Sequence, residues 1–101
     1  MEIKVVKTLD ARVINGGMRI TLSEVLLDDR QQAYFVGPLV PNRLSWRQGS
    51  FLMTKPLAEE YFELHVKYND LTAPDLTPAE EDIYCGIHTR GFNVMRDYIN
   101  R

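Results

Sequence analysis

The chain has 101 residues, of which 45% are hydrophobic and 26% are charged, and its formal net charge is −2. This length is typical of one domain, and the composition excludes a largely disordered chain. The apolar runs are far shorter than the roughly 20 residues that span a bilayer, so we expect no membrane-spanning helix and no membrane partner. The start of the chain lacks a secretory-signal pattern, and the single Cys85 can form no internal disulfide, which together predict a cytoplasmic setting.

The first predicted element is a β-hairpin around Asn15-Gly16, because a two-residue type I′ turn requires positive φ at both positions and these residues tolerate it. With this pair as the loop, Ile14 opposes Gly17 and Leu9 opposes Leu22. The register gathers apolar side chains on one face, namely Leu9, Ala11, Val13, Met18, Ile20 and Leu22. The opposite face then carries the polar side chains of Asp10, Arg12, Arg19 and Thr21. Ile3 and Val5 extend the first strand to near residue 2, with a break or bulge near Lys7.

Residues 21–36 allow two interpretations. Thr21 and Glu24 fit a capping box at the start of a helix. However, residues 28–32 form a polar segment between two β-prone runs, and we favour a third and a fourth strand. Residues 37–42 are expected to be a loop, because their two prolines remove donors from a strand ladder. Residues 51–53 are a candidate for one more short strand.

Two helices follow. The first is predicted to begin at Thr54-Lys55-Pro56 and to end at Asn69-Asp70. Its expected apolar stripe consists of Leu57, Tyr61, Leu64 and Tyr68. The second begins with the capping box Thr77-Pro78-Ala79-Glu80 and runs to about Asn100, and its Gly86 and Gly91 indicate close packing or a bend. The predicted fold is therefore α+β: one domain over 1–101 with an N-terminal antiparallel sheet of three to five strands (1–53) packed against two C-terminal helices (54–101).

The second predicted helix carries side chains of the types that bind metal ions or act in catalysis. Glu81, Cys85 and His88 share one helix face, and His65 is a conceivable fourth ligand. Structural zinc sites usually use closely spaced pairs of Cys or His, which this chain lacks. As a nucleophile, Cys85 lies two turns inside its helix, and no oxyanion donor is identifiable. We therefore predict a non-enzymatic protein with no metal and no cofactor.

The charge is distributed unevenly, and this asymmetry bears on partners. Residues 30–58 contain four basic residues and no acid, whereas residues 59–82 contain eight acids and one lysine. The basic segment suggests a single-stranded nucleic-acid site made of Arg43, Trp46, Arg47, Phe51 and Lys55. Against it, the pI of about 5.6 disfavours general affinity for nucleic acid, and such a tryptophan is often a core or interface anchor.

The acidic segment has two interpretations as well. Its carboxylates suit a solvated helix face and two helix N-termini. They also suit a docking surface for a basic protein, formed by Glu59, Glu60, Glu63, Asp70 and Asp75. Our working hypothesis is a small interaction or regulatory protein that binds a larger protein or complex as an inhibitor or adaptor. Accessory proteins of phages or mobile elements are one setting in which such chains occur. Nucleic-acid binding is the alternative.

Overall fold

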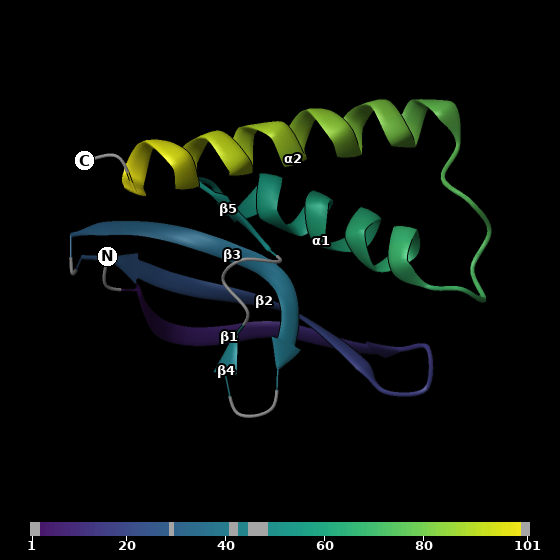
Figure 1. Cartoon of the computed structure of the whole chain (residues 1–101), viewed down its shortest axis with the longest axis horizontal. Helices are drawn as coiled ribbons and strands as arrows, with labels where there is room; N and C mark the ends of the chain where they lie inside the picture. The colour runs from purple at the N-terminus through teal and green to yellow at the C-terminus, as the bar shows by residue number, and fades with distance from the viewer. Residues whose placement is uncertain (1–2, 29, 41–42, 45–48, 100–101) are drawn as a thin grey trace.

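The computed structural model describes residues 3–28, 30–40, 43–44 and 49–99. Its elements follow the order β1 (Ile3–Ile14), β2 (Met18–Leu27), β3 (Gln31–Val40), β4 (Arg43–Leu44), β5 (Ser50–Leu52), α1 (Lys55–Asn69) and α2 (Pro78–Ile99). The strands form one antiparallel sheet in the order β1-β2-β3-β4, with β5 also paired to β3. Both helices lie over the same side of this sheet (Figure 1). The predicted α+β fold is confirmed.

The β1–β2 turn has the predicted conformation but not the predicted register. Asn15 and Gly16 have φ values of 52° and 75°, and the Gly17 N–H donates to the Ile14 carbonyl over 3.0 Å. However, the ladder pairs Ile14 with Met18, so the loop contains three residues, Asn15 to Gly17, and the predicted register is wrong by one. Further irregularities occur between Val5 and Lys7, as expected near Lys7, and between Thr8 and Asp10. Each bulge resets the alternation of side chains along the strand.

The shifted register changes which hairpin side chains are buried. Ile20 and Leu22 are buried as predicted, and Ile14 joins them. Val13 is 66% exposed and Met18 is also exposed, so their predicted burial is wrong. In the observed register Arg12 pairs with Ile20 and Ile14 pairs with Met18 on the helix side of the sheet, so the intervening Val13 points to the opposite face. Met18 lies on the helix side but at the turn end of the hairpin, where it is exposed.

Residues 21–36 form strands, as favoured over the helix, although residues 18–27 make one continuous strand. The polar turn that follows has Asp28 at φ 52°, and the Arg30 N–H donates to the Leu27 carbonyl. The loop predicted for 37–42 is wrong for residues 37–40, which continue β3; residues 41–42 lie outside the described part. Pro38 is tolerated because β5 pairs only with 34–36 and β4 only with 39–40 on that edge of β3.

Hydrophobic clusters occupy both faces of the sheet. The first cluster lies between sheet and helices and contains Ile14, Ile20, Leu22, Val36, Leu52, Ala58, Tyr61, Phe62, Tyr84 and Ile87. The second lies on the opposite face and contains Val25, Leu27, Ala33, Phe35 and Phe51. Phe35 requires glycine at position 49, because a Cβ there would lie 2.2 Å from its ring. β3 thus contributes alternating side chains to both clusters.

The helices start where the sequence predicts. Thr54 precedes α1, and its carbonyl accepts the Ala58 N–H over 3.1 Å. At the start of α2, the Glu80 N–H donates to Thr77 Oγ1 over 3.2 Å and the Thr77 N–H donates to Glu80 Oε1 over 3.0 Å, which is a reciprocal capping box. Neither helix is long and apolar enough, in the part of the chain that the structure describes, to cross a membrane.

Candidate functional site

The linker between the helices is held in place by the β1–β2 turn. Asn15 Nδ2 donates to the Asn69 carbonyl over 2.7 Å, and the Leu71 N–H donates to Asn15 Oδ1 over 2.8 Å. Asp70 Oδ1 accepts the backbone N–H and the hydroxyl of Thr72, and these bonds lower the pKa of Asp70. The carboxylate of Asp70 therefore already has intramolecular partners.

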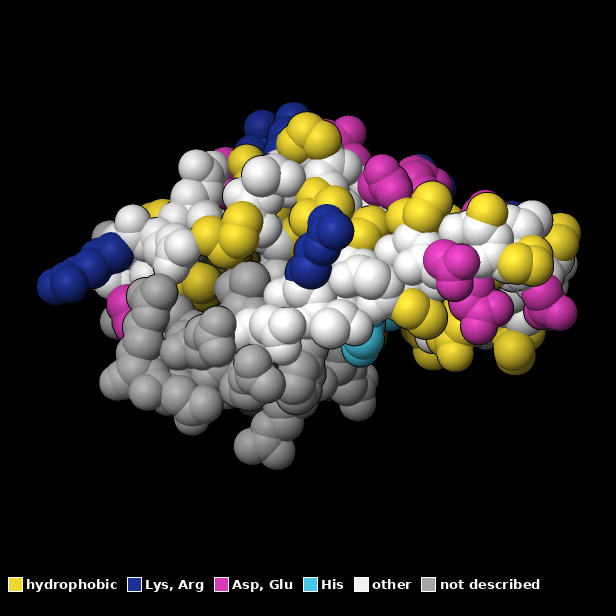
Figure 2. Space-filling view, turned by 90° about the horizontal axis from the view of Figure 1, so that it is seen from above, with side chains coloured by type: hydrophobic (Ala, Val, Ile, Leu, Met, Phe, Trp, Pro, Cys, Tyr) yellow, Lys and Arg dark blue, Asp and Glu magenta, His cyan; other side chains and the backbone are white. Residues whose placement is uncertain are grey.

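Two adjoining hollows lie between the end of α1, the linker and α2. One has a volume of about 350 Å³ and is lined by Lys67, Tyr68, Asp70, Ala73, Pro74, Asp75, Leu76 and Glu81. The other has a volume of about 410 Å³ and is lined by Tyr68, Glu81, Tyr84, Cys85, His88 and Thr89. Because they share Tyr68 and Glu81, we treat them as one feature, the helix groove. Figure 2 shows acidic side chains among hydrophobic ones at this end of the molecule.

Stacked aromatic rings form one wall of the helix groove. Tyr68 is 62% exposed, and its ring stacks on Tyr84 with centroids 5.0 Å apart. Tyr84 is only 7% exposed, stacks on Tyr61 at 5.1 Å, and its hydroxyl lies 2.7 Å from His65 Nδ1. Burial lowers the pKa of His65 to about 4, with a smaller contribution from His88, and burial raises the pKa of Tyr84. At neutral pH both groups are therefore uncharged.

A second polar contact ties α2 to β5 and α1. His88 Nδ1 lies 2.9 Å from the Tyr61 hydroxyl and 3.4 Å from Ser50 Oγ, which itself donates to Tyr61 over 3.2 Å. Gly91 allows this approach, because a Cβ there would lie 2.7 Å from Ser50 Cβ. The close packing predicted at Gly91 is confirmed, whereas a Cβ at Gly86 would meet open space.

Glu81, Cys85 and His88 line the helix groove together, as their helical spacing predicts. Cys85 is exposed, and the His88 ring is engaged by Tyr61. Among the described residues, no three side chains of His, Cys, Asp or Glu are grouped so that they could hold a metal ion.

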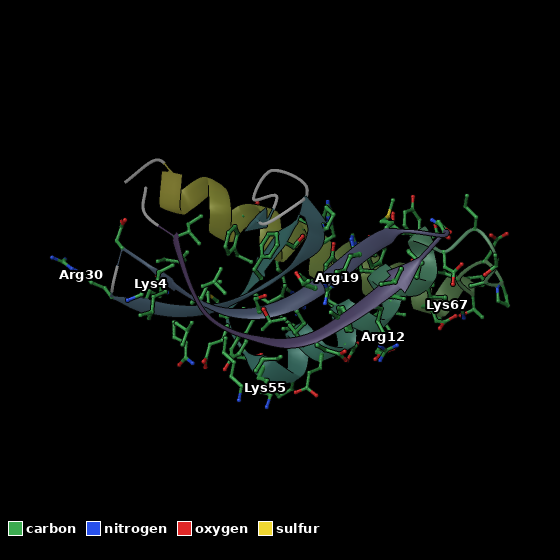
Figure 3. All side chains as sticks on the ribbon, turned by 90° about the horizontal axis from the view of Figure 1, so that it is seen from below. Lys4, Arg12, Arg19, Arg30, Lys55 and Lys67 are labelled. Atoms are coloured by element: carbon green, nitrogen blue, oxygen red, sulfur yellow. The ribbon has the colours of Figure 1, made fainter. Side chains whose placement is uncertain are left out.

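The structure divides the predicted acidic docking surface into separate parts. Glu63 receives two hydrogen bonds from Arg12, the shorter over 2.7 Å, and Figure 3 shows Arg12 beside α1. Glu59 and Glu60 are exposed on earlier turns of α1, whereas Asp70 and Asp75 meet in the helix groove. The predicted set is thus not one continuous site.

Several carboxylates remain available to a partner. Lys67 is paired with Glu80 over 2.8 Å, and this contact lowers the pKa of Glu80. Within the described ranges, no ion pair or side-chain hydrogen bond occupies Glu59, Glu60, Asp75 or Glu81. Asp75 and Glu81 therefore leave uncompensated negative charge in the helix groove.

The predicted nucleic-acid segment is only partly described. Phe51 is 1% exposed and packs against Phe35 in the second cluster, with ring centroids 5.2 Å apart. Its predicted role as a base-stacking ring is therefore wrong. Lys55 is exposed at the start of α1, and Arg43 belongs to β4. Trp46 and Arg47 lie outside the described residues.

Sequence reasoning missed two residues of the helix groove. The helical spacing predicts Tyr68 in an apolar stripe, but its side chain is exposed, and the sequence pattern indicates Glu81 only as a metal ligand or a dipole partner. Their positions offered a signal, since Tyr68 lies in the last turn of α1 and Glu81 in the first turn of α2. Residues that flank a short helix-helix linker lie close in space.

Comparison of the chain with protein-family models, with curated proteins and with solved structures gives no match.

Proposed function

We propose that this protein is a small non-enzymatic interaction protein that binds a basic segment of a larger protein and modulates it as an inhibitor or adaptor. The observation that carries the proposal is the uncompensated charge of Asp75 and Glu81 beside the exposed ring of Tyr68 in the helix groove. Glu59 and Glu60 add a separate patch of negative charge on earlier turns of α1.

Charge and shape support this kind of partner. Surface carboxylates without a cationic neighbour steer a basic partner and select against acidic ones. Tyrosine is enriched in interfaces, since it offers a large apolar ring together with a hydroxyl. A concave surface with both features suits an extended or helical basic segment.

The proposal of a non-enzymatic role rests on the side chains that line the helix groove. The imidazole nearest to Cys85 along α2 is that of His88, and its Nδ1 already contacts Tyr61. A general base needs a ring nitrogen within reach of the proton that it removes. The aromatic wall and the carboxylates are better explained by recognition than by proton transfer.

The test is affinity capture from a lysate of the cells in which the protein occurs, followed by identification of the dominant partner. The full chain is compared with two double variants that remove the same charge, D75N/E81Q and E59Q/E60Q. We expect D75N/E81Q to retain the least partner, because its carboxylates lie in the groove. D82N serves as a control, since Asp82 is exposed on the same turn of α2 but lines neither hollow.

Undiminished capture by both double variants would contradict the proposal. Capture that disappears after nuclease treatment would favour the alternative, a single-stranded nucleic-acid-binding module that uses the segment around Arg43, Trp46 and Arg47. That outcome is checked by direct binding of a labelled single strand at low salt.

A further inference from the structure

We infer that the helix groove binds an arginine side chain of the protein partner, with the guanidinium stacked on the exposed ring of Tyr68 and paired with Glu81. This inference deepens the proposed function and rests on it. It commits to one kind of side chain, whereas the proposed function requires only a basic segment.

The first argument is the position of Tyr68. Its ring belongs to both hollows, so a side chain that enters either one meets it. One face of the ring is covered by Tyr84 at a centroid distance of 5.0 Å. Tyr68 is nevertheless 62% exposed, so much of its side chain remains accessible to a ligand.

The second argument is that the Tyr68 ring stacks on a ring, Tyr84, that is itself held in position. Tyr84 is buried and is held by stacking on Tyr61 and by its contact with His65. A ring with one face packed on a buried ring loses little freedom when a ligand covers the other face. Such a platform suits a planar cation, because the ring face carries negative electrostatic potential.

The third argument is the local charge. Glu81 lines both hollows, as Tyr68 does, and Asp70 and Asp75 line the first. Lys67 is the one lysine or arginine among the described lining residues, and it is held by Glu80. A cation that enters the groove therefore meets carboxylates and is not repelled by a free basic group.

Arginine fits this arrangement better than lysine. The guanidinium is planar, stacks on aromatic faces, and presents two parallel N–H donors to one carboxylate. The lysine ammonium is a compact and strongly hydrated charge that gains less from an exposed ring.

The experiment measures fluorescence anisotropy of two labelled peptides, an oligo-arginine and an oligo-lysine of equal length, titrated with the full chain at low salt. We expect the arginine peptide to bind more tightly. Y68A should weaken its binding roughly two- to fivefold and reduce the preference over lysine, whereas Y68F should retain both. E81Q should weaken the arginine peptide more than D82N does, although both remove one charge.

Circular dichroism of each variant verifies that the fold is retained, and Y68F shows whether the ring alone suffices. Equal affinity for the two peptides, or an unchanged arginine affinity in Y68A, would overturn the inference. A different result contradicts the proposed function: D75N/E81Q and E59Q/E60Q both capture as much partner as the unmodified chain does. If the unmodified chain binds both peptides equally and D75N/E81Q binds neither, the arginine site is refuted and the proposed function is not.

Discussion

His65 and Tyr84 join the two helices through a buried polar contact, and neither group is charged at neutral pH. His65 is buried, and its pKa of about 4 lies below the ordinary value of 6.5. An unfolded chain therefore binds a proton at His65 in a pH range in which the folded chain does not. Such a difference makes stability depend on pH.

We predict that acid destabilises the protein through His65. The contribution of neutral His65 is fully present above about pH 6.5, and it is lost as the pH falls from there to about 4. The expected loss is about 3 kcal/mol in the free energy of unfolding. Urea denaturation at a series of pH values measures it.

H65Q is the control for this prediction, because glutamine retains hydrogen-bonding capacity but does not titrate. The carboxylates titrate equally in both proteins, so the difference between the two pH profiles isolates His65. Parallel profiles between pH 4 and 6.5 would show that His65 does not carry the effect.

Tyr68 and Phe51 illustrate why single residues are difficult to assign from sequence. Tyr68 has helical spacing from Tyr61 and is predicted in the apolar stripe of the helix, whereas Phe51 follows an arginine-containing segment and is a candidate base-stacking ring in the alternative hypothesis. In the structure the Tyr68 side chain is 62% exposed and the Phe51 side chain is 1% exposed. The difference from these predictions arises because α1 turns Ala58, Tyr61, Phe62 and His65 inward, and because β5 places Phe51 opposite Phe35.

At the scale of elements, the turn of the β1–β2 hairpin also forms hydrogen bonds with the C-terminal end of α1 and the linker. The Asn15 side chain bonds to the Asn69 carbonyl and to the Leu71 N–H, at a helix end that otherwise leaves carbonyls without partners. Arg12 makes a second link, because it pairs with Glu63 and lies 5.5 Å from the centre of the Phe62 ring. The long hairpin is thereby fastened to the helix that forms one side of the groove.

The two glycines of α2 should respond oppositely to substitution by alanine. G86A should raise the free energy of unfolding by up to about 1 kcal/mol, because alanine favours a helix and its Cβ meets open space. G91A should lower it by roughly 1–3 kcal/mol, because its Cβ would lie 2.7 Å from Ser50 Cβ. Urea denaturation of the two variants tests the pair, and a G91A variant as stable as G86A would refute the close contact.

At the scale of the whole molecule, β3 connects the two hydrophobic clusters. Val36 belongs to the cluster under the helices, and its neighbour Phe35 belongs to the cluster on the opposite face. β2 and β5 also contribute residues to both clusters. Loss of packing in one cluster therefore disturbs strands that the other cluster contains. This arrangement favours a single cooperative transition.

We predict that V36A and F35A, one from each cluster, lower the same unfolding transition. F35A should cost about 3–5 kcal/mol, the usual range for removing a buried phenylalanine ring. V36A, which removes less buried surface, should cost less. Thermal unfolding followed by far-UV circular dichroism and by methyl NMR signals measures both, and separate transitions for the two clusters would contradict the prediction.

The distribution of unpaired charge over the surface also depends on the fold of the whole molecule. Sequence alone identified an acidic stretch over residues 59–82, but intramolecular partners neutralise Glu63 and Glu80. The remaining charge lies on exposed positions of α1, in the helix groove and at Asp82 on α2. Which carboxylates can bind a partner therefore depends on the cations that the fold brings near them.

Local signals in the sequence sufficed for the features that depend on residues within about four positions of one another. These include the positive φ values at Asn15 and Gly16, the capping box of Thr77 and Glu80, and the start of α1 after Thr54. They follow from backbone sterics and from hydrogen bonds between near neighbours, and those forces act in any tertiary context.

The tertiary structure decided the hairpin register, the buried face of α1 and the helix groove. Each depends on contacts between segments far apart in the chain, such as Arg12 with Glu63 and Tyr68 with Tyr84. One additional loop residue, Gly17, shifts the register, and the packing of α1 through Ala58, Tyr61, Phe62 and His65 leaves Tyr68 exposed. Burial of the largest apolar surface selects among such alternatives, and that surface exists only after the strands and helices have packed together.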